Sequence, residues 1–440
     1  MKILLAPLLA LSVVAGPALA EEKKLVVITS FPKDLTSVFE AAFEKKHPGL
    51  DVEMLNKKTT AGVKYIQETT ANNTSDLFWA SAPDAFEVLK GDGLLQKYDV
   101  KTTGIPEVVG SYPINDPDGT YMGFAAAGYG IMWNERYIKA KKLPVPADWS
   151  DLEQPVYHGH IGMSAPSRSG TTHLTVETLL QGEGWDKGWA TWKTIAGNFK
   201  TVTERSFGVP DGVNSGQFGY GIVIDFFAFS SKASGFPVDF IYPKVTTLVP
   251  ANIGIVKNAP NAVMAAEFVE FLLSNEGQEL LLDPKIMRLP VRPDIYAQAP
   301  DGFPNPFKDS SIGSAVTFDV VKSKDRYNLV NSLFDVMITY RLEDLRAAVK
   351  AIQDAEAAQA GKDNAEAQQL IDEAKALVAK TPIDEATSLD KDFAAIFKKK
   401  RKKASDKIEG RQAEVEQQWD AMVQANYAKA VELANKAESM

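Results

Sequence analysis

Residues 25–48 read LVVITSFPKDLTSVFEAAFEKKHP, and the two halves of this stretch have different periodicities. Residues 25–29 form a short β-branched run, which is the composition of a buried strand. After Asp34, which can cap a helix, apolar side chains recur at helical spacing as far as Phe43, and His47-Pro48-Gly49 ends the segment. The stretch therefore predicts a strand followed by a helix, the basic unit of an α/β fold.

The same alternation continues along the chain. A second strand is expected around Val52, a helix over 61–71, a strand over 77–79 and a helix over 83–90, which gives βαβαβ spacing. A similar alternation recurs from residue 131 to residue 241, with continuous apolar runs that suit strands buried on both faces. The pattern predicts an α/β protein with mainly parallel sheets.

Composition limits the kind of protein further. The chain has 440 residues, 45% of them hydrophobic, no cysteine and a formal net charge of −9. A chain of this length can bury more than one core, so two lobes and an appendage are expected. The absence of cysteine excludes disulfides, thiolate zinc sites and thiol nucleophiles. The acidic balance argues against nucleic acid as a partner.

Residues 1–20 have the features of a secretory signal peptide. Lys2 supplies the positive start, residues 3–15 are apolar, and Ala18-Leu19-Ala20 forms a small-x-small pattern before Glu21. The apolar stretch is shorter than the roughly 20 residues that a membrane-spanning helix needs. We therefore expect cleavage before Glu21 and a periplasmic protein.

The composition changes near residue 345. Beyond that point Gly361, Gly410 and Pro382 are the only glycines and prolines, and Ala, Glu, Lys, Gln and Asp dominate. These residue types predict two or three amphipathic helices over 345–440, forming a separable helical module. The basic run at residues 398–403 fits a solvated helix face, or a contact with an anionic lipid or an acidic partner.

Polar residues follow several predicted strands. In an open parallel sheet the carboxyl ends of the strands meet at one edge, and ligands bind there. The ligand-binding residues expected on this basis are Ser30, Trp79, Ser81, Ser167, Ser169, Gly170, Thr171, Thr172, Arg205, Ser206 and Asp225.

Residues 164–173, SAPSRSGTTH, are chemically the most suggestive segment. They follow a predicted strand and precede a predicted helix, so hydroxyl groups, Arg168 and free backbone N–H groups gather at a helix N-terminus, which attracts anions. An ordinary Ser/Thr cap explains any single hydroxyl equally well. The spacing G-x-x-x-x-G-K-[ST] is absent, so nucleotide hydrolysis is not indicated.

Residues 149–161, WSDLEQPVYHGHI, carry a family resemblance. They resemble the W-x-D-L…P-x-Y-x-G-x-I signature of periplasmic solute-binding proteins of ABC importers, in the group that takes ferric iron, thiamine, polyamines, hexose phosphates or phosphoglycerates. Together with residues 164–173, the segments RSFGV at 205–209, VID at 223–225 and RLPVRP at 288–293 are most similar to the phosphoglycerate and sugar-phosphate branch.

This resemblance implies a two-lobed, type II-like periplasmic-binding-protein fold that closes on a ligand, with ABC permease and ATPase subunits as partners. Lobe 1 is expected over 24–124 and 252–344, and lobe 2 over 125–251. The crossing segments are expected near residues 123–128 and 248–252. A helical extension at 345–440 is added to the usual length.

Several alternatives stay open for the ligand. Arg205 and Arg168 suit a phosphate, because a guanidinium can make two parallel bonds to its oxygens. Asp225 with Trp79 fits an organic cation such as thiamine or a polyamine as well as the hydroxyl groups of an anionic ligand. No two tyrosines are adjacent, so the usual ferric site of the group, and any metal site, is not expected. Arg288 and Arg292 are expected to hold the returning chain against lobe 1.

Enzymatic activity is not expected. Neither G-x-S-x-G nor H-E-x-x-H occurs, no catalytic residue is assigned, and no cofactor is expected. A ligand-sensing role beside a membrane receptor would use the same cleft, and the helical tail could contact such a sensor, so sensing remains an alternative to transport.

Overall fold

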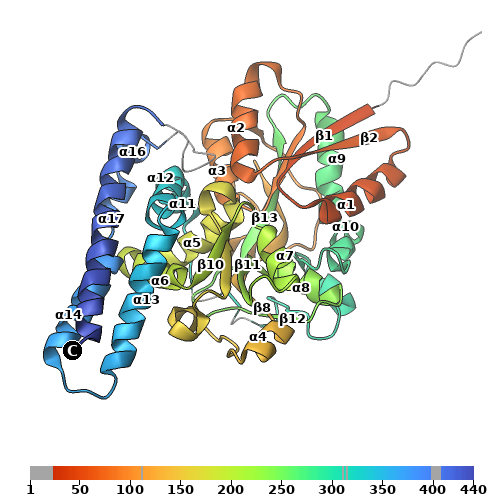
Figure 1. Ribbon diagram of the computed structural model, residues 1–440. Helices are drawn as coiled ribbons and strands as arrows, with labels where there is room; N and C mark the ends of the chain where they lie inside the picture. Colours follow the sequence, from red (N-terminus) through yellow and green to blue (C-terminus); the bar gives the residue numbers. More distant parts are fainter. Residues whose placement is uncertain (1–22, 111, 310–311, 314–315, 398–407) are drawn as a thin grey trace, which may run out of the picture.

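The computed structural model describes residues 23–110, 112–309, 312–313, 316–397 and 408–440. The expected signal peptide and the basic run at 398–403 lie outside these residues. Two sheets with surrounding helices form the body of the molecule, and a bundle of long helices lies along one side of it (Figure 1). Among the described helices, none is both long and apolar enough to span a bilayer.

The first sheet combines strands from two separate parts of the chain, residues 23–127 and residues 249–290. Its strand order is β14-β7-β13-β3-β1-β2, with β4 also paired to β13. The strands are β1 (Lys23–Thr29), β2 (Leu50–Asn56), β3 (Leu77–Ala80), β4 (Leu95–Gln96), β7 (Met122–Ala127), β13 (Val249–Val256) and β14 (Leu289–Pro290). The helices around it are α1 (Lys33–Lys46), α2 (Thr59–Thr69), α3 (Pro83–Gly91), α9 (Ala262–Leu273) and α10 (Asn275–Glu279). Phe43 of α1 packs on Phe268 of α9, with ring centroids 4.9 Å apart, as part of this lobe's core.

The second sheet lies wholly within the middle of the chain. Its order is β10-β9-β11-β8-β12. The strands are β8 (Tyr129–Asn134), β9 (Ile161–Ser164), β10 (Phe199–Thr203), β11 (Tyr220–Ile224) and β12 (Val238–Ile241). Its helices are α4 (Glu135–Lys141), α5 (Gly170–Glu183), α6 (Trp185–Gly197), α7 (Gly208–Asn214) and α8 (Asp225–Ala233).

Both sheets are mixed, which corrects the expectation of mainly parallel sheets. Strand β1 pairs parallel with β2 and β3, and β9 pairs parallel with β10 and β11. By contrast β13 is antiparallel to β3 and β7, and β8 is antiparallel to β11 and β12. A parallel neighbour needs a long crossover connection, usually a helix. Strands β8 and β13 each enter their sheet directly from the other sheet, because only Gly128 separates β7 from β8 and only residues 242–248 separate β12 from β13. We call these two segments the passages. No helical crossover from a neighbouring strand therefore leads into β8 or β13.

The C-terminal region is helical, as expected. It contains α13 (Leu342–Gln359), α14 (Ala365–Ala379), α15 (Glu385–Leu389), α16 (Lys391–Ala394) and α17 (Arg411–Glu438). Helices α13, α14 and α17 lie side by side in the bundle of Figure 1.

The extension shares a hydrophobic core with the second sheet, so the expected separable module is not what the structure shows. Val349 of α13 packs directly on Gly197, at the end of α6. The Lys193 ammonium, on a fully buried side chain, donates to the carbonyl oxygens of Ala379 and Lys380 at 2.7 and 2.9 Å, and burial lowers its pKa to about 7. Helix-forming composition determines local structure, whereas the surface that each apolar face covers depends on tertiary packing.

The segment before the extension also differs from the expected boundaries. Residues up to 344 are expected in the first lobe. In the structure, α12 (Tyr327–Phe334) places Leu329, Leu333 and Phe334 in the core of the second sheet and the extension.

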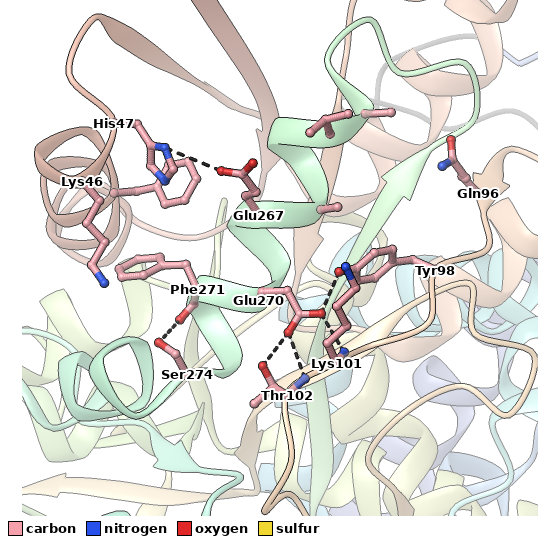
Figure 2. Close-up of a pocket in the computed structure, with 14 residues that line it drawn as sticks. Lys46, His47, Gln96, Tyr98, Lys101, Thr102, Glu267, Glu270, Phe271 and Ser274 are labelled. Atoms are coloured by element: carbon pink, nitrogen blue, oxygen red, sulfur yellow. Dashed lines mark hydrogen bonds and ion pairs between the residues drawn. The ribbon is translucent and has the colours of Figure 1, made fainter.

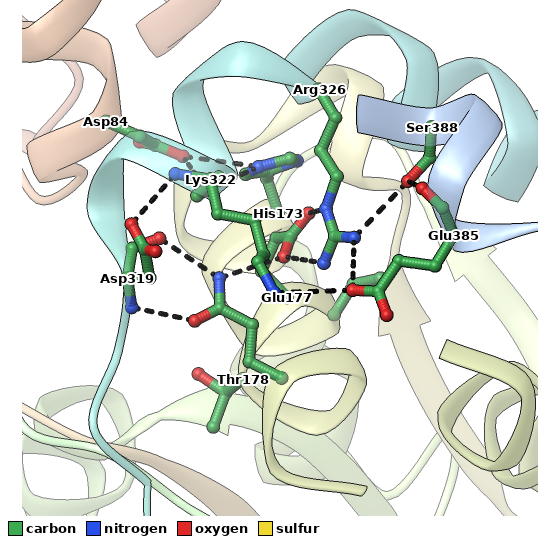
Figure 3. Close-up of polar contacts among 12 residues, drawn as sticks. Asp84, His173, Glu177, Thr178, Asp319, Lys322, Arg326, Glu385 and Ser388 are labelled. Atoms are coloured by element: carbon green, nitrogen blue, oxygen red, sulfur yellow. Dashed lines mark hydrogen bonds and ion pairs between the residues drawn. The ribbon is translucent and has the colours of Figure 1, made fainter. Parts of the chain in front are cut away.

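A buried polar network joins both lobes to this C-terminal segment (Figure 3). Arg326 donates to both carboxylate oxygens of Glu177 on α5, at 2.8 Å each, and both side chains are fully buried. Beside this pair, the Asp84 carboxylate of α3 lies 3.2 Å from His173 Nε2 of α5. It also accepts a hydrogen bond from the Ser323 hydroxyl at 3.1 Å. The network therefore ties α3 of the first lobe and α5 of the second lobe to the C-terminal segment.

Replacing Glu177 by Gln should destabilise the protein strongly. Burial alone would raise the pKa of Glu177, but the charge and hydrogen bonds of Arg326 hold it below its usual value. Without the Glu177 charge, the buried Arg326 keeps only its longer ion pair with Glu385, at 3.3 Å. Removing one partner of a buried ion pair costs on the order of 3–5 kcal/mol. Urea denaturation at pH 7 should show this loss. The difference from the unmodified protein should shrink as the pH falls through the lowered pKa of Glu177.

The exposed pair of Glu343 with Arg346 supplies the control for this measurement. Glu343→Gln should change the unfolding free energy by less than about 1 kcal/mol. Equal stabilities for Glu177→Gln and Glu343→Gln would contradict the role given to the buried pair.

Candidate ligand site

A small cavity lies between the two lobes, beyond the carboxyl ends of β1, β3, β9 and β10. The first lobe lines it with Ser30, Phe31, Pro32, Lys58, Thr59 and Ser81, and the second lobe with Arg168, Ser169, Thr171, Arg205, Ser206, Phe207, Phe226 and Phe227. Its free volume is about 20 Å³, room for about one water molecule. The side chains of the two lobes therefore leave little free space at this cavity.

The structure brings together six of the residues that the sequence nominated: Ser30, Ser81, Ser169, Thr171, Arg205 and Ser206. They come from loops after four different strands, and the rule that ligands bind at the carboxyl ends of strands predicted them. Ser167, Gly170 and Thr172 are outside the lining. A Cβ atom on Gly170 would lie 2.8 Å from the Ala82 Cβ, so this glycine permits the close approach of the lobes.

The start of α5 faces the cavity. Ser169 is its N-cap, and its hydroxyl accepts a hydrogen bond from the Thr172 N–H at 3.2 Å. The Thr172 hydroxyl bonds to Ser164, so it serves the local structure. Gly170 and Thr171 open the helix, and their N–H groups have no carbonyl partner within it. This helix terminus can therefore receive an anion.

Cations surround the cavity. Lys58, Arg168 and Arg205 line it, and no Asp or Glu among the residues that the structure describes does so. Glu204 lies outside the lining and pairs with Lys58 at 2.6 Å and with Arg168 at 3.0 Å, which joins the lobes across the rim. Arg205 lies over the Phe207 ring and donates to the Asn56 side-chain oxygen at 3.2 Å, another contact between the lobes.

The sequence predicts that Arg288 and Arg292 both hold the returning chain against the first lobe, and the structure separates their roles. Arg292 does hold the chain, because it donates to the Thr103 carbonyl at 2.7 Å and pairs with Asp294. Arg288 instead lies fully buried against Phe31 and Phe226, two residues that line the cavity. In the sequence, this buried position is indicated by a single charged residue within the otherwise apolar stretch 286–291.

Trp79 does not reach the cavity, which corrects its predicted role. The indole is fully buried, with Phe31, Phe39, Phe124 and Phe268 around it at centroid distances of 5.2 to 5.8 Å. Strand β3 is covered on both faces, so the side chain at its end joins the aromatic core under Phe31.

Asp225 is also outside the lining, because its oxygens are already used. Oδ2 accepts hydrogen bonds from the Gly128 N–H at 2.7 Å and the Tyr242 hydroxyl at 2.8 Å, and Oδ1 accepts one from the Phe226 N–H at 2.7 Å. Burial raises the pKa of Asp225 to about 6, and these bonds and Arg288 act in the opposite direction. Gly128 and Tyr242 belong to the two passages between the sheets, so Asp225 ties the passages together.

A second hollow, of about 740 Å³, lies on the outer face of the first lobe (Figure 2). The Glu270 carboxylate in it is saturated by the Tyr98 hydroxyl, the Lys101 N–H and Thr102. Its lining carries two carboxylates, Glu267 and Glu270, beside the ammonium groups of Lys46 and Lys101, so it lacks the excess of positive charge found in the interlobe cavity.

The sequence-family model of bacterial extracellular solute-binding proteins matches residues 72–322 of this chain. The phosphoglycerate transport regulatory protein PgtC of Salmonella typhimurium is 30% identical over 88% of this chain and 92% of its own length. The chain belongs to the bacterial extracellular solute-binding protein family.

Solved structures of bacterial binding proteins share the fold. The periplasmic binding protein AfuA of Actinobacillus pleuropneumoniae, with fructose-6-phosphate bound, superposes with a TM-score of 0.63 at 19% identity, over 72% of this chain and 99% of AfuA. Iron-bound HitA of Pseudomonas aeruginosa gives a TM-score of 0.55 at 18% identity, over 67% of this chain and 96% of HitA. This solute-binding protein therefore has the two-lobed, type II periplasmic-binding-protein fold with an added helical C-terminus.

Replacing Asp225 by Asn should weaken the tie between the passages. An amide has one acceptor oxygen, so it cannot serve the donors now divided between Oδ1 and Oδ2, and a buried donor is left unsatisfied. Such a loss costs about 1–3 kcal/mol. Urea denaturation should show it, with the exposed Asp99→Asn as the control. An unchanged midpoint would mean that the carboxylate does not hold the passages.

Proposed function

We propose that this protein captures a small phosphorylated organic anion, a phosphoglycerate or a sugar phosphate, in the periplasm and delivers it to an ABC importer. The observation that carries the proposal is the cavity at the start of α5, where three cations and several hydroxyl groups meet without a carboxylate in the lining. Guanidinium groups and free helix N–H groups are the common partners of phosphate oxygens.

The comparisons support an anion of this kind. The relative PgtC is named for phosphoglycerate transport, and AfuA was solved with fructose-6-phosphate. The organic-cation alternative depended on Asp225 and Trp79, and neither lines the cavity. The ferric alternative would use adjacent tyrosines, and no two tyrosines are adjacent in this sequence.

Lobe closure would couple capture to delivery. We propose that the two sheet-bearing lobes rotate about Gly128 and residues 242–248, so that an open form admits the ligand and the closed form encloses it. The word "regulatory" in the name of PgtC favours a second candidate role, in which the closed protein reports its ligand to a membrane sensor. Crosslinking of the ligand-loaded protein in its own membrane would distinguish a permease partner from a sensor.

Export is part of this proposal. The chain isolated from the periplasm should begin at Glu21, because the small-x-small pattern before it fits cleavage by signal peptidase. Mass spectrometry of the intact protein checks this, and a preponderance of chains that retain Met1 would contradict it.

Phosphorylated ligands should raise the melting temperature of the full chain, and their unphosphorylated forms should not. The thermal-shift panel comprises 3-phosphoglycerate, glucose 6-phosphate, fructose 6-phosphate, glycerate, glucose, spermidine, thiamine and ferric citrate. Arg205→Ala removes one charged hydrogen-bond partner, worth about 1.5–3 kcal/mol, and should weaken binding of the stabilising phosphate ester at least roughly tenfold.

The exposed Arg136→Ala, on α4, makes the same change in net charge away from the cavity and should leave the affinity unchanged. Stabilisation by spermidine, thiamine or ferric citrate alone, unaffected by Arg205→Ala, would overturn the anion proposal.

A further inference from the structure

Arg288 is a buried cation that forms no ion pair with any described carboxylate. Its side chain has no exposed surface, and its Nε and Nη1 atoms have no hydrogen-bond partner among the residues that the structure describes. Nη2 makes one long hydrogen bond, 3.4 Å, to the Ser81 hydroxyl. Asp225 contributes a favourable charge from farther away. Burying a guanidinium in this state is unfavourable unless another group compensates its charge.

Three phenyl rings supply part of that compensation. The Arg288 guanidinium carbon lies 4.8 Å from the ring centre of Phe31, 5.7 Å from that of Phe124 and 4.3 Å from that of Phe226. Cation–π contacts are made through the ring faces and leave the N–H groups of the cation without an acceptor. The fold therefore holds the charge in place and leaves donor capacity on the guanidinium.

The guanidinium of Arg288, with its unused N–H donors, lies next to the interlobe cavity. Ser81, Phe31 and Phe226, which surround the guanidinium, all line the interlobe cavity, and Phe226 comes from the opposite lobe. Arg288 thus stands behind the inner wall of the cavity. Lys58 and Arg168 stand at the rim, where they pair with the exposed Glu204. The rim cations line the cavity, whereas Arg288 lies behind the side chains of its inner wall.

We infer that Arg288 binds a second anionic group of the ligand, a carboxylate, at the inner end of the cavity, while the rim cations and the start of α5 hold its phosphate. This inference rests on the proposed function and narrows it to phosphorylated carboxylic acids over sugar phosphates. A carboxylate is planar and takes two parallel hydrogen bonds from one edge of a guanidinium, so it fits between ring faces better than a tetrahedral phosphate.

The test compares two ligands that differ at one carbon. In 3-phosphoglycerate this carbon is a carboxylate, and in glycerol 3-phosphate it is a hydroxymethyl group. Isothermal titration of the full chain should give at least a tenfold tighter affinity for 3-phosphoglycerate. Arg288→Met, an unbranched apolar replacement for the same ring cage, should lose at least tenfold for 3-phosphoglycerate and change glycerol 3-phosphate by less than threefold.

Two further variants make the result specific. Arg288→Lys keeps the charge but cannot make two parallel hydrogen bonds, so it should retain part of the preference for 3-phosphoglycerate over glycerol 3-phosphate. This variant also takes the place of Arg288→Met in the test if Arg288→Met does not fold. Arg292→Met, at an arginine that contacts Thr103 and Asp294 away from the cavity, should leave both affinities unchanged.

The outcomes separate this inference from the proposed function. Equal affinities of the unmodified protein for the two ligands, or equal losses for both in Arg288→Met, would overturn the role of Arg288 and leave phosphate-ester binding intact. Binding of neither ligand, and of no sugar phosphate, would overturn both.

Discussion

The chain passes between its two sheets at Gly128 and again over residues 242–248, and the buried Asp225 carboxylate accepts hydrogen bonds from both passages. All other covalent connections of the second sheet lead into its own helices. The Asp225 hydrogen bonds therefore hold the two passages together at the junction of the lobes, in addition to the contacts of Arg326 and Ser323 with Glu177 and Asp84. A Cβ atom on Gly128 would lie 2.7 Å from the Tyr242 ring, so the tie also needs a glycine there.

The ligand cavity depends on that constraint, because neither lobe contains it alone. In the proposed closure, Lys58 of the first lobe comes beside Arg168 and Arg205 of the second, and the mutual repulsion of these cations opposes it. Glu204 offsets part of that repulsion by pairing with Lys58 and Arg168. A bound anion would offset the remainder, which couples binding to closure, since a ligand favours the state in which it makes more contacts.

The extension follows the second lobe in any such motion. It shares that lobe's core through α6, and Arg326 fastens the segment before it to Glu177 of α5. Ser323 of the same segment also bonds to Asp84 of the first lobe. The C-terminal segment therefore reaches the lobe interface, and closure of the cleft affects its contacts as well as those of the ligand cavity.

The sequence by itself determined the elements and much of the candidate site. Periodicity and composition predict the first βαβαβ unit and the helical C-terminus, because both depend on neighbours in the chain. The rule for strand ends found Ser30, Ser81 and Arg205, which line the cavity. Strand direction after each passage, the fusion of the extension with the second lobe, and the roles of Trp79, Asp225 and Arg288 were decided by the tertiary structure. They depend on which segments, far apart in the chain, meet at one place, and on whether a polar atom's hydrogen bonds are already taken there.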